Sequence, residues 1–219
     1  MWVIFLGPPG CGKGSQAACF VEKYGYSTIC AGDLLRENRD RVIDKEGNTI
    51  GSVITSGYLL PDHVTTSVVS EKMNEVHGKN IIFDGFPRTI MQVRALENLA
   101  ESFQKKVNCV INFTIDEDTV LKRISGRYQC ATCARIYNKY FLSPQVEGIC
   151  DGCGGTTFIQ RSDDNEEALM KRLKEYNGKT YPLIDFYSRS GILYNVNADA
   201  PFDVVTEDVI DVLKKEEIS

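Results

Sequence analysis

A chain of 219 residues, 42% of them hydrophobic and 25% charged, is long enough to bury a full hydrophobic core. Its formal net charge of -5 argues against a protein that holds nucleic acid by bulk electrostatics, because such domains are usually basic. The N-terminal apolar run stops at Gly7 with no basic segment before it, which is too short for a signal peptide or a membrane span. We therefore expect a globular protein of the cytoplasm, with neither a membrane nor a nucleic acid as partner.

Short β-branched runs alternate along the chain with amphipathic stretches, which is the pattern of βαβ units. The predicted strands are residues 2–6, 27–30, 80–84, 107–114 and 192–196. The predicted helices are residues 15–24, 33–41, 62–76, 89–101, 117–123, 165–188 and 206–215. The predicted fold class is α/β, with three layers around a central five-stranded parallel sheet.

Two segments interrupt this alternation. Residues 38–61 are polar and helical, and they end in a turn. Residues 126–162 include the glycine-rich stretch 152–155, have little apolar periodicity and contain two C-x-x-C pairs, which predicts a small insert held by a metal rather than by a core. Disulfides are rare in a reducing compartment, and this spacing is the one that a structural zinc site requires. The predicted ligands are Cys130, Cys133, Cys150 and Cys153.

A glycine-rich loop, residues 7–13, follows the first strand and precedes the first helix. In that position backbone N–H groups surround a phosphate at the positive end of the helix, and Lys13 reaches the β and γ phosphates. The loop departs from the general phosphate-loop pattern, because Gly14 stands where the magnesium-binding hydroxyl is expected and Ser15 follows one residue later. The predicted phosphate-binding residues of the ATP site are Gly10, Cys11, Gly12, Lys13, Gly14 and Ser15.

Several motifs in order resemble the adenylate kinase family, and the resemblance covers the whole chain. Residues 7–16, GPPGCGKGSQ, are similar to the phosphate loop of the family, residues 31–36, AGDLLR, to its T-G-D-[ML]-L-R, and residues 84–89, DGFPRT, match its next motif without a change. The four cysteines and residues 161–167 are similar to the long-lid, zinc-containing subgroup. The resemblance implies a monomer that transfers the terminal phosphate of Mg-ATP reversibly to AMP, giving two ADP.

The resemblance also divides the chain into parts. It implies a phosphate-loop core of residues 1–30, 61–125 and 164–219, an AMP-binding insert of residues 31–60, and a zinc-binding lid of residues 126–163. At the lid exit, Asp163 and Glu166 have the spacing of a capping box, which predicts an abrupt helix start and a hinge. Ala134 replaces the glycine that commonly follows the first cysteine pair, which predicts a strained turn, whereas Gly154 and Gly155 make the second pair permissive.

Phosphoryl transfer between two nucleotides concentrates negative charge, so cations must converge and arginine suits phosphate because it binds in a bidentate manner. The resemblance implies that Arg36 and Arg88 hold the AMP phosphate. The catalytic set that it implies is Lys13, Arg88, Arg123, Arg127, Arg161, Arg172 and Asp84.

Within this set, Arg123 and Arg127 belong to the ATP side, and Arg161 and Arg172 connect donor and acceptor. Asp84 ends an apolar strand at the ligand-binding edge of the sheet and would hold Mg²⁺ through water. A simple helix-capping role for Asp84 remains the alternative.

The contacts to the two bases come from the resemblance alone. The ATP base would contact Ile136, Tyr137 and Ala200. The AMP site would include Ala31, Tyr58, Leu59, Leu60, Gly85, Phe86, Pro87 and Gln92, of which Gln92 faces the adenine edge. Ala31 departs from the usual threonine of the family, so the site loses one hydroxyl worth about 1 kcal/mol. Asp33, next along the motif, is either functional or the N-cap of the helix after it.

Three alternatives remain open at this point. The first is a nucleoside monophosphate kinase with another acceptor, or with GTP as donor. The second is a zinc-ribbon module that binds nucleic acid, against which the acidic composition argues. The third is a nucleotide-dependent switch or hydrolase, which would turn over ATP without an acceptor.

Overall fold

The computed structural model describes residues 1–76, 80–161 and 164–218. Its centre is an all-parallel sheet in the order β2-β3-β1-β4-β8, so the predicted α/β fold class is confirmed. Two strands have the predicted bounds, and the others differ by one or two residues. The strands are β1 (Trp2–Leu6), β2 (Ser27–Cys30), β3 (Ile81–Asp84), β4 (Cys109–Thr114) and β8 (Leu193–Asn197).

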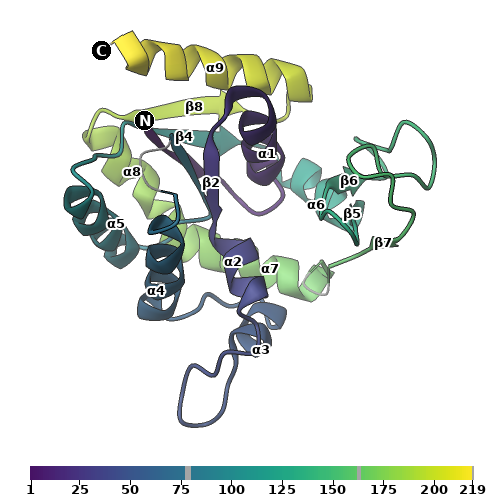
Figure 1. Cartoon of the computed structure of the whole chain (residues 1–219), viewed down its shortest axis with the longest axis horizontal. Coiled ribbons are helices and arrows are strands. Elements are labelled where there is room, and N and C mark those ends of the chain that lie inside the picture. The colour runs from purple at the N-terminus through teal and green to yellow at the C-terminus, as the bar shows by residue number, and fades with distance from the viewer. Residues whose placement is uncertain (77–79, 162–163, 219) are drawn as a thin grey trace.

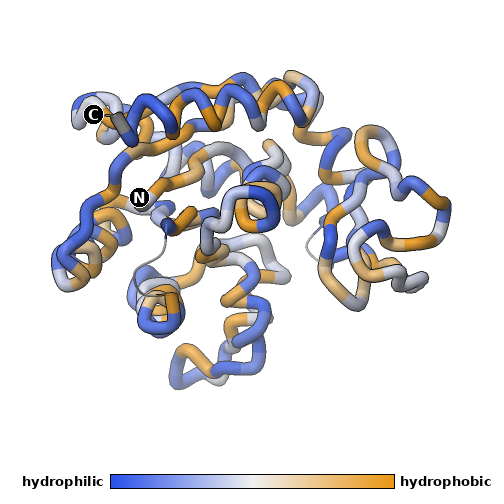
Figure 2. Tube along the Cα trace, turned by 45° about the horizontal axis from the view of Figure 1, so that its top comes forward, coloured by the Kyte–Doolittle hydropathy of each residue, from blue (hydrophilic) through white to orange (hydrophobic). Residues whose placement is uncertain are grey.

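Helices cover both faces of this sheet (Figure 1). On one face α1 (Lys13–Tyr24) and α9 (Phe202–Ile218) bury apolar residues such as Phe20 and Val209 against the strands. On the other face lie α4 (Asp62–Met73), α5 (Ile90–Ser102) and α8 (Pro182–Arg189). The inner strands β1, β3 and β4 are nearly continuously apolar because both faces are covered. In Figure 2 hydrophobic and hydrophilic residues alternate along the helix that ends at the C-terminus, as expected of a helix with one face on the sheet.

The parallel register brings the ends of three strands to one edge of the sheet. Phe5 of β1 pairs with Asp84 of β3, and Cys30 of β2 pairs with the same residue from the other side. The phosphate loop, the 85–89 loop and the helix after β2 all begin there. Ligands of open α/β sheets bind at this carboxyl edge, so the fold collects the predicted motifs where a ligand is expected.

The predicted insert contains two short helices, α2 (Ala31–Glu37) and α3 (Ile50–Thr55). Ile50 of α3 forms a small buried cluster with Leu60 and with Val64 of α4. The helix predicted at residues 33–41 lies at 31–37 in the structure, as α2. The helix ends early because Asn38 closes it, donating from its side-chain amide to Leu34 O at 2.8 Å. It begins early, so Asp33 lies inside its first turn and is not its N-cap, a position that Cys30 occupies.

The predicted single helix 165–188 is wrong. It consists of α7 (Glu166–Glu175), a π-helical turn η1 (Tyr176–Thr180) and then α8. Its predicted capping residue, Asp163, lies outside the described residues. Asn165 is the N-cap, accepting from Ala168 N.

The last helix, α9, begins four residues before its predicted start at Thr206. Thr206 is not a cap, because its hydroxyl donates inside the structure to Gln16 Oε1 or to Phe202 O, each at 2.9 Å. The remaining helix of the core, α6 (Glu117–Ser125), extends two residues beyond its predicted end. None of the helices in the described residues is long and apolar enough to cross a membrane.

The lid projects beside α6 and contains its own three-stranded antiparallel sheet, in the order β6-β5-β7 (Figure 1). Its strands are β5 (Arg127–Cys130), β6 (Ile136–Asn138) and β7 (Phe158–Ile159). The prediction of an insert without a core needs correction, since Tyr137 is 1% exposed, stacks on Tyr128 and makes an edge-to-face contact with Phe158. Aromatic packing therefore stabilises the lid in addition to any metal.

The two cysteine turns of the lid have the same geometry. Ala134 N donates to Cys130 O in the first, and Gly154 N donates to Cys150 O in the second. Both residues have a left-handed backbone conformation, with φ of 57° at Ala134 and 72° at Gly154. An alanine pays a steric cost in this conformation that a glycine avoids, as the sequence predicted.

We expect Ala134→Gly to stabilise the lid by about 0.5 kcal/mol, because the relieved strain exceeds the extra entropy of an unfolded glycine. Amide hydrogen exchange of the metal-loaded protein measures this as slower opening of lid residues. Ala131→Gly is the control, since Ala131 lies in the same exposed turn without a left-handed φ and should lose stability. Faster exchange in both variants would contradict the strain argument.

Candidate active site

The phosphate loop depends on glycine at positions where a side chain has no room. Gly10 has φ of 83°, and a Cβ there would lie 2.8 Å from Ile124 Cγ1 of α6. Gly12 has φ of 101° and is the N-cap of α1. The loop therefore packs directly against α6 while its backbone turns into the positive end of α1.

Lys13 folds back over this loop. Its Nζ donates to Gly7 O at 2.8 Å and to Pro8 O at 2.9 Å, and it lies 3.3 Å from Cys11 Sγ. Cys11 is 2% exposed, so the loop presents backbone and the lysine amine to a ligand, not the thiol. The ammonium group is held in place by carbonyl dipoles that a phosphate would replace.

Arg123 of α6 joins the loop to the connection between β8 and α9. Its Nη1 donates to Cys11 O at 3.0 Å and its Nη2 to Ala198 O at 2.7 Å. Burial lowers the pKa of this guanidinium from its usual value. Ala200, predicted at the ATP base, lies two residues beyond Ala198 and is partly buried against the core.

Phe141 of the lid lies over Arg123, with the guanidinium carbon 5.6 Å from the ring centroid. It is 53% exposed. Sequence reasoning missed this residue, because no motif marks it and its role depends on a contact between the lid and α6. A planar cation under an exposed aromatic ring is an arrangement that can hold a base by stacking.

Asp84 is 8% exposed and lies between β2 and the start of α1. Cys30 Sγ donates to its Oδ2 at 3.6 Å. Burial, followed by the charges of Asp84 and Asp33, raises the pKa of the Cys30 thiol well above its usual range, so the thiol keeps the proton that it donates. A Cβ on Gly14 would lie 3.2 Å from the same Oδ2, so a side chain at position 14 would crowd this carboxylate.

The 85–92 segment positions Arg88. A Cβ on Gly85 would lie 2.9 Å from Arg88 Nη2, and Arg88 Nε donates to Gly85 O at 2.9 Å. The main chain of Arg88 is held on both sides: its N–H donates to Gln92 Oε1 at 2.8 Å and its carbonyl accepts from Thr180 Oγ1 at 3.0 Å. The π-helical turn thus supplies a hydroxyl to the loop that carries the arginine.

Asp33 brings together two of the predicted phosphate ligands. Arg36 Nη2 donates to its Oδ1 at 2.6 Å, and Arg161 Nη2 lies 3.8 Å from the same oxygen. Burial alone would raise the pKa of Asp33, but the hydrogen bond and charge of Arg36, helped by Cys30 and Arg161, lower it. Arg161 also donates from Nε to Gln129 Oε1 of β5 at 2.8 Å, so one arginine joins the lid to α2.

Asp164 holds the other lid arginine and was missed as a site residue. Its side chain is 0% exposed and binds Arg127 through both oxygens, with Nε at 2.7 Å from Oδ2. Arg172 of α7 lies 3.8 Å from Oδ1. In the structure, the buried Asp164 carboxylate holds two arginine side chains near each other. In the sequence, Asp164 is only one acidic residue among several.

The predicted base contacts are less uniform. Ala31, Leu60, Phe86 and Gln92 are buried, whereas Tyr58 is 55% exposed and its ring lies under Lys171 Nζ. Pro87 is also buried, and Leu59 and Ile136 are partly exposed. Tyr137 is 1% exposed, so its ring is packed inside the lid and does not face a ligand.

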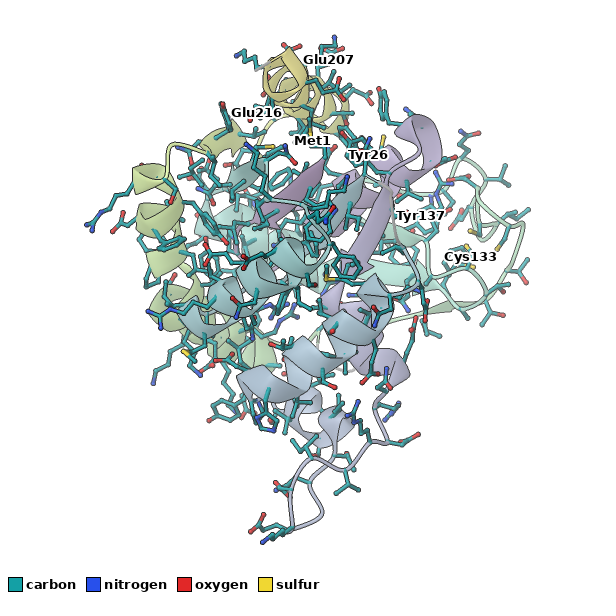
Figure 3. All side chains as sticks on the ribbon, turned by 60° about the vertical axis from the view of Figure 1, so that its left-hand side comes forward. Met1, Tyr26, Cys133, Tyr137, Glu207 and Glu216 are labelled. Atoms are coloured by element: carbon teal, nitrogen blue, oxygen red, sulfur yellow. The ribbon has the colours of Figure 1, made fainter. Side chains whose placement is uncertain are left out.

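The four paired cysteines have the geometry of a closed metal site. Their Sγ atoms all lie within 4.8 Å of one another, with Cys130 to Cys153 at 3.6 Å and Cys133 to Cys150 at 3.5 Å. Four thiolates about 2.3 Å from one tetrahedral zinc would be about 3.8 Å apart, so the donor set fits. Cys133 and Tyr137 are labelled in Figure 3 within this lid.

A hydrogen bond extends this site into the lid sheet. The Tyr137 hydroxyl donates to Cys150 Sγ at 3.4 Å and accepts from Asp151 N at 2.7 Å. The Tyr137 hydroxyl, with the N–H groups of Gly152 and Cys153, lowers the pKa of the Cys150 thiol to about 6 despite burial. The hydrogen bond from Tyr137 thus favours the thiolate form of Cys150, which is the form that metals bind.

Comparison with known proteins agrees with this geometry. A sequence model of the family described as adenylate kinase matches residues 5–192. The chain belongs to the adenylate kinase family. The adenylate kinase of Thermosipho africanus is 40% identical over 218 residues, which cover 98% of this chain and 100% of the relative. Those of Borrelia turicatae and Archaeoglobus fulgidus are 42% and 39% identical, each over 98% of this chain and over 100% and 99% of the relative.

This assignment confirms the resemblance inferred from the motifs, and the cysteine cluster is consistent with the zinc-lid subgroup of adenylate kinases. Adenylate kinases are phosphotransferases that act on nucleotides with Mg²⁺. None of the alternatives open after the sequence analysis gains support from these relatives.

We expect Arg127→Met to destabilise the protein by about 3 kcal/mol, because among the described residues it leaves the buried Asp164 carboxylate with the more distant Arg172 as its cation. Urea unfolding measures the change. Lys72→Met is the control: it removes one partner of an exposed pair with Glu75 and should cost less than about 0.5 kcal/mol. Equal losses in the two variants would show that Asp164 does not depend on Arg127.

Proposed function

We propose that the protein transfers the terminal phosphate of Mg-ATP to AMP, reversibly, giving two ADP. The observation that carries this is the meeting of the phosphate loop and the Asp84–Arg88 loop at one edge of the parallel sheet. One loop offers backbone N–H groups and Lys13 for a donor phosphate, and the other offers Arg88 for an acceptor phosphate. Two anion sites on adjacent strands suit transfer between two nucleotides.

The proposed donor nucleotide binds along α1 and α6. Backbone N–H groups of residues 10–15 and the Lys13 amine bind its β and γ phosphates, which displaces the amine from the loop carbonyls. Its base lies between Arg123, Phe141 and the backbone of Ala200, and Ile136 with the Tyr137 backbone forms the lid side. Arg127 approaches from the lid.

The proposed acceptor binds between α2, α3 and the 85–92 loop. Arg36 and Arg88 bind its phosphate, and its base lies against Ala31, the 58–60 segment, residues 85–87 and the Gln92 amide. Arg161 and Arg172 lie between donor and acceptor. An oxygen of the acceptor phosphate attacks directly, so no side chain acts as a covalent nucleophile.

Two metals complete the proposal. Asp84, nearly buried at the sheet edge and beside Gly14, is placed to hold Mg²⁺ through water, and the ion would neutralise charge on the transferred phosphate. Zn²⁺ would bind Cys130, Cys133, Cys150 and Cys153 in a purely structural role, because four thiolates leave no open position. Closure of the lid would exclude water and prevent hydrolysis.

We place the boundaries of the core, insert and lid where the sequence analysis put them, at 31–60 for the AMP-binding insert and 126–163 for the lid. The separate small core of the lid sheet, around Cys130, Tyr137 and Cys150, supports the lid boundary. We also propose that the enzyme is a cytoplasmic monomer without a nucleic-acid partner. The net charge of -5 supports the last point, and size-exclusion chromatography with light scattering tests the oligomeric state.

A different acceptor is the second candidate function. It is favoured by one observation, Ala31, which is 2% exposed and offers no hydroxyl to a base. Product chromatography after mixing the protein with Mg-ATP and each of AMP, GMP, CMP and UMP decides between them. ADP formed with AMP alone supports the proposal, transfer to another acceptor supports the second candidate, and ADP formed without any acceptor identifies a hydrolase.

We expect Lys13→Met to lower turnover at least a hundredfold, because it removes the charge nearest the transferring phosphate. Steady-state kinetics with Mg-ATP and AMP measures this, and circular dichroism checks that the fold is retained. Lys23→Met, in the last turn of the same helix and exposed, should keep normal turnover. Near-normal turnover of Lys13→Met would exclude the proposed mechanism.

We expect Cys130→Ser to abolish stoichiometric zinc binding and to lower the melting temperature, because one of four ligands is lost. Elemental analysis and thermal unfolding measure the two effects. Cys19→Ser, at a buried position of α1 outside the lid, is the control and should lower stability without changing zinc content. Unchanged zinc content in Cys130→Ser would refute the four-cysteine site.

A further inference from the structure

Asp62, the first residue of α4, belongs to none of the motifs, yet it contacts the side chain proposed to read the acceptor base. Its Oδ1 accepts from Gln92 Nε2 at 2.8 Å and from Thr89 Oγ1 at 2.9 Å. Thr89 is in turn the N-cap of α5 and accepts from Gln92 N at 3.1 Å. Asp62, Thr89 and Gln92 are therefore joined by hydrogen bonds, with the Asp62 carboxylate on the NH₂ group of the Gln92 amide.

The two partners of the Gln92 amide leave no ambiguity about its orientation. A carboxylate can only accept a hydrogen bond, so the NH₂ group must face Asp62. The main-chain N–H of Arg88 can only donate, so the carbonyl oxygen must face Arg88, at 2.8 Å. Turning the amide over would set donor against donor and acceptor against acceptor at both ends. Gln92 is 2% exposed, so water cannot relieve this cost.

An amide held in this way keeps one N–H and one oxygen lone pair for a ligand. They suit a base that offers an amino group as donor beside a ring nitrogen as acceptor, as the Watson–Crick edge of adenine does. A 6-oxopurine offers the reverse, an oxygen acceptor beside a ring N–H, and would need the amide turned over. The same carboxylate that fixes the amide thus rejects this class of base.

We propose that Asp62 is a specificity-determining residue, which locks the Gln92 amide so that the acceptor site takes 6-aminopurine nucleotides and rejects 6-oxopurine nucleotides. The inference rests on the proposed function, in which Gln92 faces the acceptor base. Asp62 itself touches neither substrate and acts through Gln92 as a positioning residue.

The test compares AMP with IMP, which differ only at the base edge in question. For each acceptor we would measure kcat/KM with Mg-ATP, and the dissociation constant by calorimetry without ATP. The wild-type protein should prefer AMP, and Asp62→Asn should reduce the AMP to IMP ratio about tenfold, the value of roughly one hydrogen bond. A structural defect alone would lower both acceptors together and leave the ratio unchanged.

Asp62→Ala is a second variant, which removes the carboxylate without introducing a new amide group. It should lower the AMP to IMP ratio as well. Asp185→Asn is the matched control, because it removes an exposed acidic residue from the first turn of α8 and should keep the wild-type ratio.

A wild-type ratio retained in both Asp62 variants, or a wild-type protein without preference for AMP over IMP, would overturn the inference. Failure of the wild type to use AMP at all would instead overturn the proposed function.

Discussion

The parallel pairing of β1 with β3, and of β3 with β2, is the constraint on which the rest of the site depends. It places Leu6, Asp84 and Cys30 at one edge, so three loops start within reach of one another. This pairing is stabilised by apolar strands buried on both faces, and it does not require the polar loops to attract each other. The hydrophobic core thus supplies the free energy that holds many cations close together.

Those cations are held by the protein before any nucleotide binds. Asp164 pairs with Arg127 and Arg172, and Asp33 pairs with Arg36 and Arg161. Main-chain carbonyls play the same part for Lys13 and Arg123, as shown by their hydrogen bonds to the phosphate loop. A phosphate that enters such a site exchanges one anionic partner for another, so the arginines need not be gathered from water. Preorganised cations stabilise a transition state because little reorganisation remains to be done.

The sequence predicted what local patterns and motifs can encode. The alternation of strands and helices, the phosphate loop and the four cysteines each depend on residues close together in the chain, and all appear in the structure. What it missed depends on contacts between distant segments. Examples are the π-helical turn whose Thr180 bonds to Arg88, the position of Phe141 over Arg123, and the burial of Asp164. The start of α9 was placed four residues late, at Thr206, whose hydroxyl lies inside the helix and bonds to Gln16 or to Phe202 O.

The lid illustrates how a metal and a small core can share one task. Tyr137 of β6 stacks on Tyr128 and contacts Phe158 edge-to-face, and its hydroxyl bonds to Cys150 and Asp151 in the second cysteine turn. Tyr137 therefore connects the aromatic cluster to a predicted metal ligand. The next residue of β6, Asn138, donates to Arg123 O of α6 at 2.6 Å. A metal at the cysteines would stiffen the same strand that faces α6. Because the metal site is closed, this stiffening can change the geometry of the nucleotide site without the metal taking part in the chemistry.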